Sequence, residues 1–236
     1  MRRFLAISLL MLPFGAQALT DTEKRAESAV GVLKEMMAIP ESSIPERLLA
    51  EAYAIAVVPD VGEAGFVFGG RYGKGLVSIR GKDGAWSNPN YIKLIGGSVG
   101  FQAGVQSSDV ILVFTKPDGV NSIINGKLTL GADAAIAAGP VGRSAQASTD
   151  TKFKAEIFSY ARSKGLFAGV SLDGTAITID RKANTQMYGD MQSPASIFDG
   201  RTQTENKSVI AFRNELEEAS SYRPMNAPDT NKPVTQ

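Results

Sequence analysis

The sequence predicts an α+β fold in which a curved, glycine-rich antiparallel β-sheet, sandwich- or barrel-like, is flanked by N-terminal and C-terminal helices. Apolar residues recur at helical spacing in residues 21–38 and 207–221, whereas residues 55–180 are dominated by a period of two. In addition, 12 of the 24 glycines lie between residues 62 and 104. Glycine at this density in strand-period sequence indicates close backbone approach or a tightly curved sheet.

The two ends of the chain differ from the middle. Arg2 and Arg3 precede an apolar run over residues 4–14, and Ala16-Gln17-Ala18 is an A-x-A cleavage site. We therefore expect a cleaved signal peptide over residues 1–18 and, in a bacterium, a periplasmic protein. At the other end, residues 223–236 hold three prolines and few apolar residues, which predicts a disordered tail. The expected units between them are an N-terminal amphipathic helix (19–39) and a domain (40–222) that includes the C-terminal helix.

The first predicted helix has a small apolar stripe made of Ala26, Val30, Leu33 and Met37, and it ends at Ile39-Pro40. Its polar face is slightly acidic. Such a helix either docks on the sheet or inserts into a membrane, and the absence of Trp and Phe from its apolar face favours docking. A second, short helix is predicted from a capping box at residues 43–46.

Strand-period segments follow one another from residue 55. The first is expected to stop at Pro59, the last three are expected to form a meander, and a short helix is expected near residues 120–124. The expected strands cover residues 55–58, 65–80 with a kink, 97–106, 110–114, 132–138, 153–162, 166–172 and 175–180. Within them, Gly73, Gly100 and Gly169 are predicted to be packing glycines.

The composition excludes several classes of chemistry. The chain has no Cys and no His, which removes disulfides, thiolate metal sites, Cys nucleophiles, lipid attachment to cysteine and the commonest metal ligand. The formal net charge is +1, and loss of Arg2 and Arg3 makes it −1, which does not suit a general nucleic-acid binder. The glycine-rich residues 69–75 match neither nucleotide-binding loop and run into a strand rather than a helix. We expect no cofactor, no metal, no nucleotide and no nucleic acid.

Several ordered motifs between residues 40 and 190 are similar to the SYLF domain family. The strongest is the run SYARSKGLFAGVSL at residues 159–172; the others are AIAVVP at 54–59, AGFVFGG at 64–70, GAWSNP at 84–89 and GGSVGFQAG at 96–104. The resemblance implies a lipid-binding domain that recognises phospholipids, including phosphoinositides, without catalysis. In eukaryotic members it also implies an N-terminal amphipathic helix that contacts the membrane and a link to actin.

The sequence thus predicts a non-catalytic phospholipid-binding protein of the periplasm or cell envelope, peripheral to a membrane surface. Actin is implied by the eukaryotic relatives only and is not an expected partner in a periplasm. The alternative is a structural or protein-interaction module of the periplasm. A hydrolase that uses Ser and carboxylate groups has no supporting motif, so we do not expect an enzyme.

The candidate lipid-binding residues come from two basic segments, residues 71–93 and 143–164. If both segments lie on one face, they would attract anionic headgroups, and their aromatic residues suit a membrane interface. The alternatives are solvated charges on strand edges and, for the tryptophan, a packing anchor. The candidates are Arg71, Tyr72, Lys74, Trp86, Arg143, Arg162 and Lys164.

Overall fold

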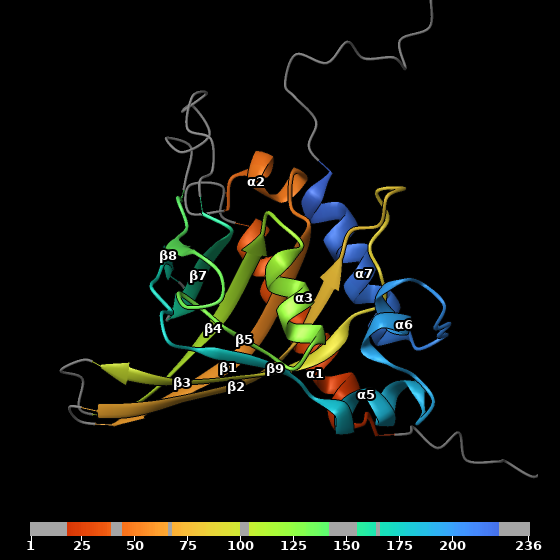
Figure 1. The fold of residues 1–236 in the computed structure, drawn as a ribbon, viewed down its shortest axis with the longest axis horizontal. Coiled ribbons are helices and arrows are strands. Elements are labelled where there is room, and N and C mark those ends of the chain that lie inside the picture. Colours follow the sequence, from red (N-terminus) through yellow and green to blue (C-terminus); the bar gives the residue numbers. More distant parts are fainter. Residues whose placement is uncertain are drawn as a thin grey trace, which may run out of the picture.

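The computed structural model describes residues 18–38, 44–65, 68–99, 104–141, 155–163 and 166–221. The predicted tail and nearly all of the predicted signal peptide lie outside these residues, as do Gly100, Arg143 and Lys164. Nine strands of the described chain form one strongly curled sheet (Figure 1). The α+β prediction, with helices at both ends of the described chain, is confirmed.

The sheet is antiparallel except for one parallel pair, β6 with β7. Its order is β5-β9-β3-β2-β1-β4-β7-β6, and β8 pairs with β7. The strands are β1 (Ala54–Gly65), β2 (Phe68–Ile79), β3 (Asn90–Val99), β4 (Gly104–Phe114), β5 (Lys127–Thr129), β6 (Ile136–Ala138), β7 (Ile157–Ser163), β8 (Leu166–Gly169) and β9 (Ala176–Ile179).

Helices cover both faces of the sheet. On one face α1 (Asp21–Met37) packs beside α7 (Lys207–Ser220) and over β1 and β2, with α2 (Glu46–Ala50) next to α7. On the other face α3 (Asp118–Ile124) contacts β5 and β9. Two short helices, α5 (Arg181–Tyr188) and α6 (Pro194–Phe198), contact β3. The sheet therefore has one core on the α1 face and another on the α3 face. Because side chains alternate along a strand, Leu76 packs into the core on the α1 face and Val77 into the core on the α3 face.

The α1 helix is docked, as its apolar face predicted. Its side chains Ala26, Ala29 and Leu33 are fully buried. Polar contacts with α7 run along its length: Glu23 accepts from the Asn206 side-chain amide at 2.8 Å, Glu27 accepts from Ser208 at 3.3 Å, and Lys34 lies 3.8 Å from Glu215. The helix is therefore part of the domain core in this structure.

Two of the strand boundaries that were predicted wrongly matter most for the sheet. The first strand does not stop at Pro59 but continues to Gly65, because a register shift near Val58 and Val61 accommodates the proline, with Asp60 at φ +49°. The expected strand over 97–106 is split between the end of β3 and the start of β4, which are separated in the sheet by β2 and β1.

The expected meander is correct only for its first two strands. β7 and β8 form a hairpin, but β9 crosses to the opposite end of the sheet and pairs with β3 and β5. This crossing places Asp180, the residue after β9, next to β3. Asp180 is also the N-cap of α5, a helix that the sequence analysis did not predict, and neither did it predict α6.

Candidate functional site

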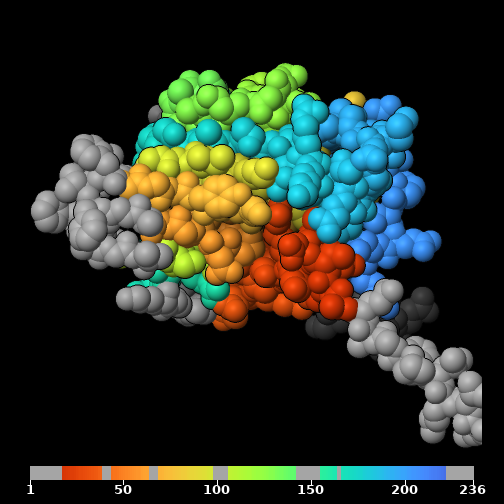
Figure 2. Space-filling view, turned by 90° about the horizontal axis from the view of Figure 1, so that it is seen from below, coloured from red at the N-terminus to blue at the C-terminus, as the bar shows by residue number. Residues whose placement is uncertain are grey.

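A pocket of about 230 Å³ opens where the first turns of α1 meet β2, β3 and α5. Figure 2 looks onto this face, where α1 (red) lies beside the orange and yellow strands and the cyan segment that contains α5. Four cationic and two anionic side chains line the pocket, and Tyr72 is also part of its wall. The charged residues are Arg25, Lys74, Lys93, Lys182, Asp21 and Asp180.

The register of β2 and β3 puts two lysines directly opposite each other. Lys74 pairs with Lys93, and the next pair on the same face is Leu76 with Tyr91, which is fully buried in the core beneath α1. Like charges at opposed positions destabilise a sheet, so this arrangement does not serve the stability of the fold. The lysine pair concentrates positive charge on the sheet at the edge of the area that α1 covers.

Asp180 neutralises part of this charge. Its carboxylate lies 3.2 Å from Arg25 Nη1 and 3.3 Å from Lys93 Nζ, and it also caps α5 by accepting from the Ala183 N–H. Burial acts to raise the pKa of Asp180, but the hydrogen bonds from Arg25 and Ala183 and the charge of Lys93 outweigh it and hold the pKa below 3.8. In the described part of the chain, Lys74 and Lys182 have no carboxylate within ion-pair distance.

The lowered pKa of Asp180 predicts a pH-dependent part of the stability. A carboxyl with a depressed native pKa stabilises the fold above its unfolded pKa, and this contribution is lost as pH falls through the native value. We expect the urea-unfolding midpoints of wild type and Asp180→Asn to differ at pH 7 and to converge as pH falls below 3.8. A difference that stays constant down to the acid limit would show that the ion pairs of Asp180 add nothing to stability.

Tyr91 fixes two walls of the pocket to β3. Its hydroxyl donates to the Thr22 carbonyl at 3.1 Å, and the Arg25 guanidinium lies 5.3 Å from its ring centroid. Its backbone N–H donates to Asn184 Oδ1 at 2.8 Å, which holds α5. Burial raises the pKa of Tyr91, so the hydroxyl stays a neutral donor. The first turn of α1 is thereby positioned as a wall of the pocket.

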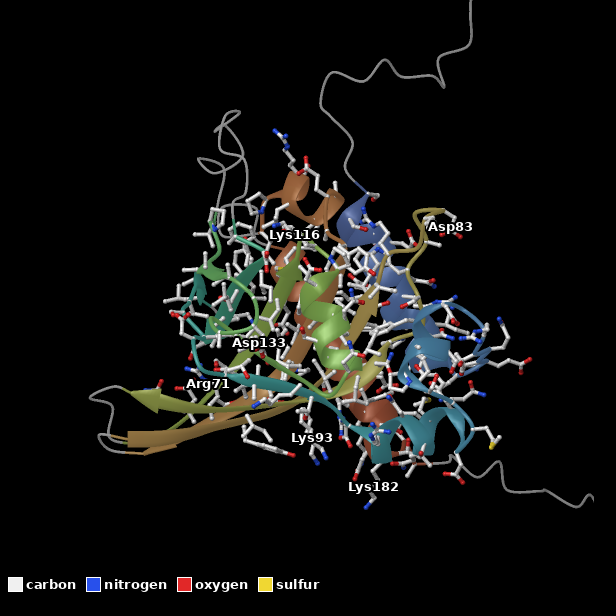
Figure 3. The ribbon with its side chains drawn as sticks, viewed as in Figure 1. Arg71, Asp83, Lys93, Lys116, Asp133 and Lys182 are labelled. Atoms are coloured by element: carbon white, nitrogen blue, oxygen red, sulfur yellow. The ribbon has the colours of Figure 1, made fainter. Side chains whose placement is uncertain are left out.

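Of the five candidate residues that the structure describes, two line this pocket, Tyr72 and Lys74. Arg71 lies on the opposite side of the β2–β3 ribbon from Lys93 and Lys182 (Figure 3) and is bound to Glu63 at 2.5 Å. Among the described residues, Arg162 of β7 does not share a continuous face with the basic residues of β2, because β1 and β4 separate β2 from β7; the other basic residues of the segment 143–164 lie outside the described residues.

The other described candidates are engaged elsewhere. Arg162 of β7 binds Asp109 at 2.6 Å and also contacts Glu35 of α1. Trp86 is 4% exposed, its Nε1 donates to Ser220 Oγ at 2.9 Å, and Arg80 stacks on its ring. This geometry matches the packing-anchor alternative for the tryptophan.

Sequence reasoning missed Arg25, Lys93, Lys182 and Asp180. Lys93 lies inside the basic segment 71–93, so its signal was present. Asp180 is a residue type that often caps a helix N-terminus, and here it accepts from the Ala183 N–H three positions later. This weak signal could have indicated α5. Nothing local in the sequence connects α1 to this site.

The strongest family motif has a structural role. Ser159 donates to the Val170 carbonyl at 2.6 Å and Tyr160 donates to the Pro140 carbonyl at 3.2 Å, which ties β7 to its neighbours. Gly169 of β8 lies against the Gly139 backbone. These contacts hold β7 against β8 and against residues 139–140.

Comparison with known proteins agrees with these motifs. Residues 95–219 match a family described as Ysc84, Las17-binding protein actin regulator. This match covers more than half of the chain. The chain belongs to the SYLF (Ysc84) family. In the part of this SYLF chain that the structure describes, no helix is long and apolar enough to cross a bilayer.

Three relatives indicate how far the similarity extends. LAS seventeen-binding protein 3 of Saccharomyces cerevisiae is 36% identical over 211 residues, 88% of this chain and 46% of the yeast protein. Protein YSC84 of the same yeast is 38% identical over 186 residues, 77% of this chain and 40% of that protein. Human SH3 domain-containing YSC84-like protein 1 is 33% identical over 175 residues, 72% and 51% respectively.

This SYLF chain spans about half the length of the curated relatives it matches. The family description and the name of one relative, LAS seventeen-binding protein 3, state binding to Las17, and the family description adds actin regulation; none of the printed names is that of an enzyme. Among the residues that the structure describes, no group of three or more acidic side chains is placed to hold a metal ion.

Proposed function

We propose that this SYLF protein is a non-catalytic binding protein for anionic phospholipids at the surface of a periplasmic membrane, and that the pocket takes the phosphate of the headgroup. The observation that carries the proposal is the opposed pair Lys74 and Lys93 beside Lys182 and Arg25, with Tyr72 exposed next to them. The periplasmic location rests on the leader-like residues 1–18.

The charge and size of the pocket suit a headgroup. Four cations against two carboxylates leave an excess of positive charge, and each cation near an anionic membrane contributes about 1 kcal/mol of binding free energy. The volume of about 230 Å³ lies below the range of roughly 300–1,000 Å³ that is usual for drug-sized ligands. A single phosphate group fits this space better than a nucleotide does.

The names of the relatives support a binding role rather than catalysis, and the chain has neither His nor Cys to act near neutral pH. They also favour a second candidate, a protein-interaction module, because the family description names Las17 binding. The opposed lysines favour lipid, since a structural module gains nothing from a destabilising charge pair at its surface.

The decisive experiment is vesicle flotation with a matched charge control. We expect Lys74→Glu/Lys182→Glu to weaken binding to vesicles of phosphatidylcholine with about one third phosphatidylglycerol by at least about tenfold, since four units of charge change beside the headgroup. The control Lys82→Glu/Lys127→Glu changes the same net charge at exposed positions outside the pocket and should bind as wild type does.

Equal losses in both double variants would show that only general charge matters. Wild-type protein that does not float with these vesicles would contradict lipid binding and favour the protein-interaction module. Binding should also weaken as salt rises above about 0.15 M, where the Debye length is roughly 8 Å or less.

A further inference from the structure

We propose that Tyr72 and Ile95 form an apolar ridge that enters the interfacial layer of the bilayer, so that the outer face of the β2–β3 ribbon lies on the membrane. The inference rests on the proposed function and adds to it the surface that contacts lipid and the orientation of the domain.

Three successive cross-strand pairs on one face of the ribbon change character in order. Leu76 and Tyr91 are buried under α1; Lys74 and Lys93 follow at the pocket; Tyr72 and Ile95 come last. Successive same-face pairs are about 7 Å apart along a strand. The ridge therefore lies one step beyond the opposed lysines, on the side away from the core.

Both ridge side chains are exposed although they are large and apolar. Tyr72 is 47% and Ile95 is 49% exposed, and they are directly opposed in the register. The next same-face positions, Gly70 and Gly97, carry no side chain that could cover them. In the described part of the chain, the other exposed large apolar residues, Leu19, Leu166 and Met191, come from separate segments.

Charge decides which partner covers the ridge. A second copy of the same face would bring its lysines against those of the first, which opposes self-association. An anionic bilayer presents phosphates at the level of the lysines and hydrocarbon just below them. Tyrosine is enriched at that boundary because its ring is apolar and its hydroxyl stays hydrated. With this face on the membrane, the long lysine side chains can reach the phosphates while the adjacent ridge contacts the interfacial layer.

Tryptophan fluorescence gives a direct test, because the only tryptophan of the chain, Trp86, is buried. An Ile95→Trp variant should show a blue-shifted emission on phosphatidylglycerol-containing vesicles and should be quenched by brominated acyl chains. A Leu166→Trp variant, at a position 77% exposed in β8, should show neither change. Wild type supplies the signal of Trp86 to be subtracted.

A pair of binding measurements separates the ridge from the pocket. Ile95→Thr changes a ridge residue that does not line the pocket, keeps strand propensity and should weaken vesicle binding by roughly fivefold, because apolar area is lost from the contact. The same variant should bind inorganic phosphate as wild type does, and Leu166→Thr should change neither.

Each outcome has a distinct meaning. A bound but unquenched Ile95→Trp protein, or an Ile95→Thr variant that floats as wild type does, overturns the ridge and leaves headgroup binding in place. If wild type binds neither inorganic phosphate nor the vesicles, the proposed function is overturned and the ridge with it. Quenching of Ile95→Trp but not of Leu166→Trp, together with phosphate binding by Ile95→Thr, supports the ridge and the proposed function.

Discussion

Replacing Gly169 with valine is expected to destabilise the protein by at least about 3 kcal/mol, the upper end of what overpacking usually costs. A Cβ at this position would lie 2.2 Å from the Gly139 carbonyl oxygen and 2.7 Å from the Gly139 nitrogen. These are backbone atoms of the neighbouring chain segment, so no side-chain rotation relieves the clash. For a chain of this size the thermal midpoint should fall by roughly 6–12 °C.

Gly97→Val is the matched control, because a Cβ there meets nothing within 4 Å and its backbone is in a strand. It should leave the midpoint nearly unchanged. Equal midpoints for Gly169→Val and Gly97→Val would show that β8 can move away from Gly139 at little cost. At Gly73, the other predicted packing glycine that is described, an added Cβ would lie 2.6 Å from Val58 Cγ1, a clash that rotation of the valine side chain could partly relieve.

Asp180→Asn is expected to strengthen binding to anionic vesicles by roughly tenfold, which corresponds to about 1.4 kcal/mol. In wild type the carboxylate of Asp180 forms ion pairs with Arg25 and Lys93, and a lipid phosphate must compete with it for both cations. Asparagine caps a helix about as well as aspartate, so α5 should still begin at the same residue. Flotation over a series of protein concentrations measures the change.

Removal of any negative charge near the pocket favours anions, and Asp21→Asn measures this general effect. Asp21 lines the same pocket, is exposed, and has no ion-pair partner among the described residues. We expect Asp21→Asn to strengthen binding by less than Asp180→Asn. Equal gains in the two variants would mean that Arg25 and Lys93 do not contact the headgroup.

The elements that the sequence predicted well are those with a strong period. The stripe of α1 reflects one buried face, which is a local property of the chain. The apolar residues of β2 likewise mark a strand locally, although Leu76 and Val77 are buried on opposite faces of the sheet. By contrast α5 has eight residues, of which only Ala183 and Asn184 are buried, so it has no apolar stripe to detect. The strand over 97–106 was misplaced because its alternation continues from the end of β3 into the start of β4.

The candidate site was predicted in part for the same reason. Tyr72 and Lys74 stand out locally in a basic segment, and the structure places both at the pocket. Arg71 could have been separated from them, since neighbours in a strand point to opposite faces. Arg25 and Asp180 could not have been paired, because 155 residues separate them and only the crossing of β9 brings them together.

The polar contacts between α1 and α7 determine when the domain can be completed. The partners Glu23 and Asn206 are 183 residues apart, and Glu27 and Ser208 are 181 apart. During synthesis α1 emerges long before α7, so its apolar face has no final partner until almost the whole described chain is available. Contacts of such long sequence separation slow folding. The pocket, which has α1 as a wall, thus forms late, and a chain that ends before α7 lacks the support that holds this wall in place.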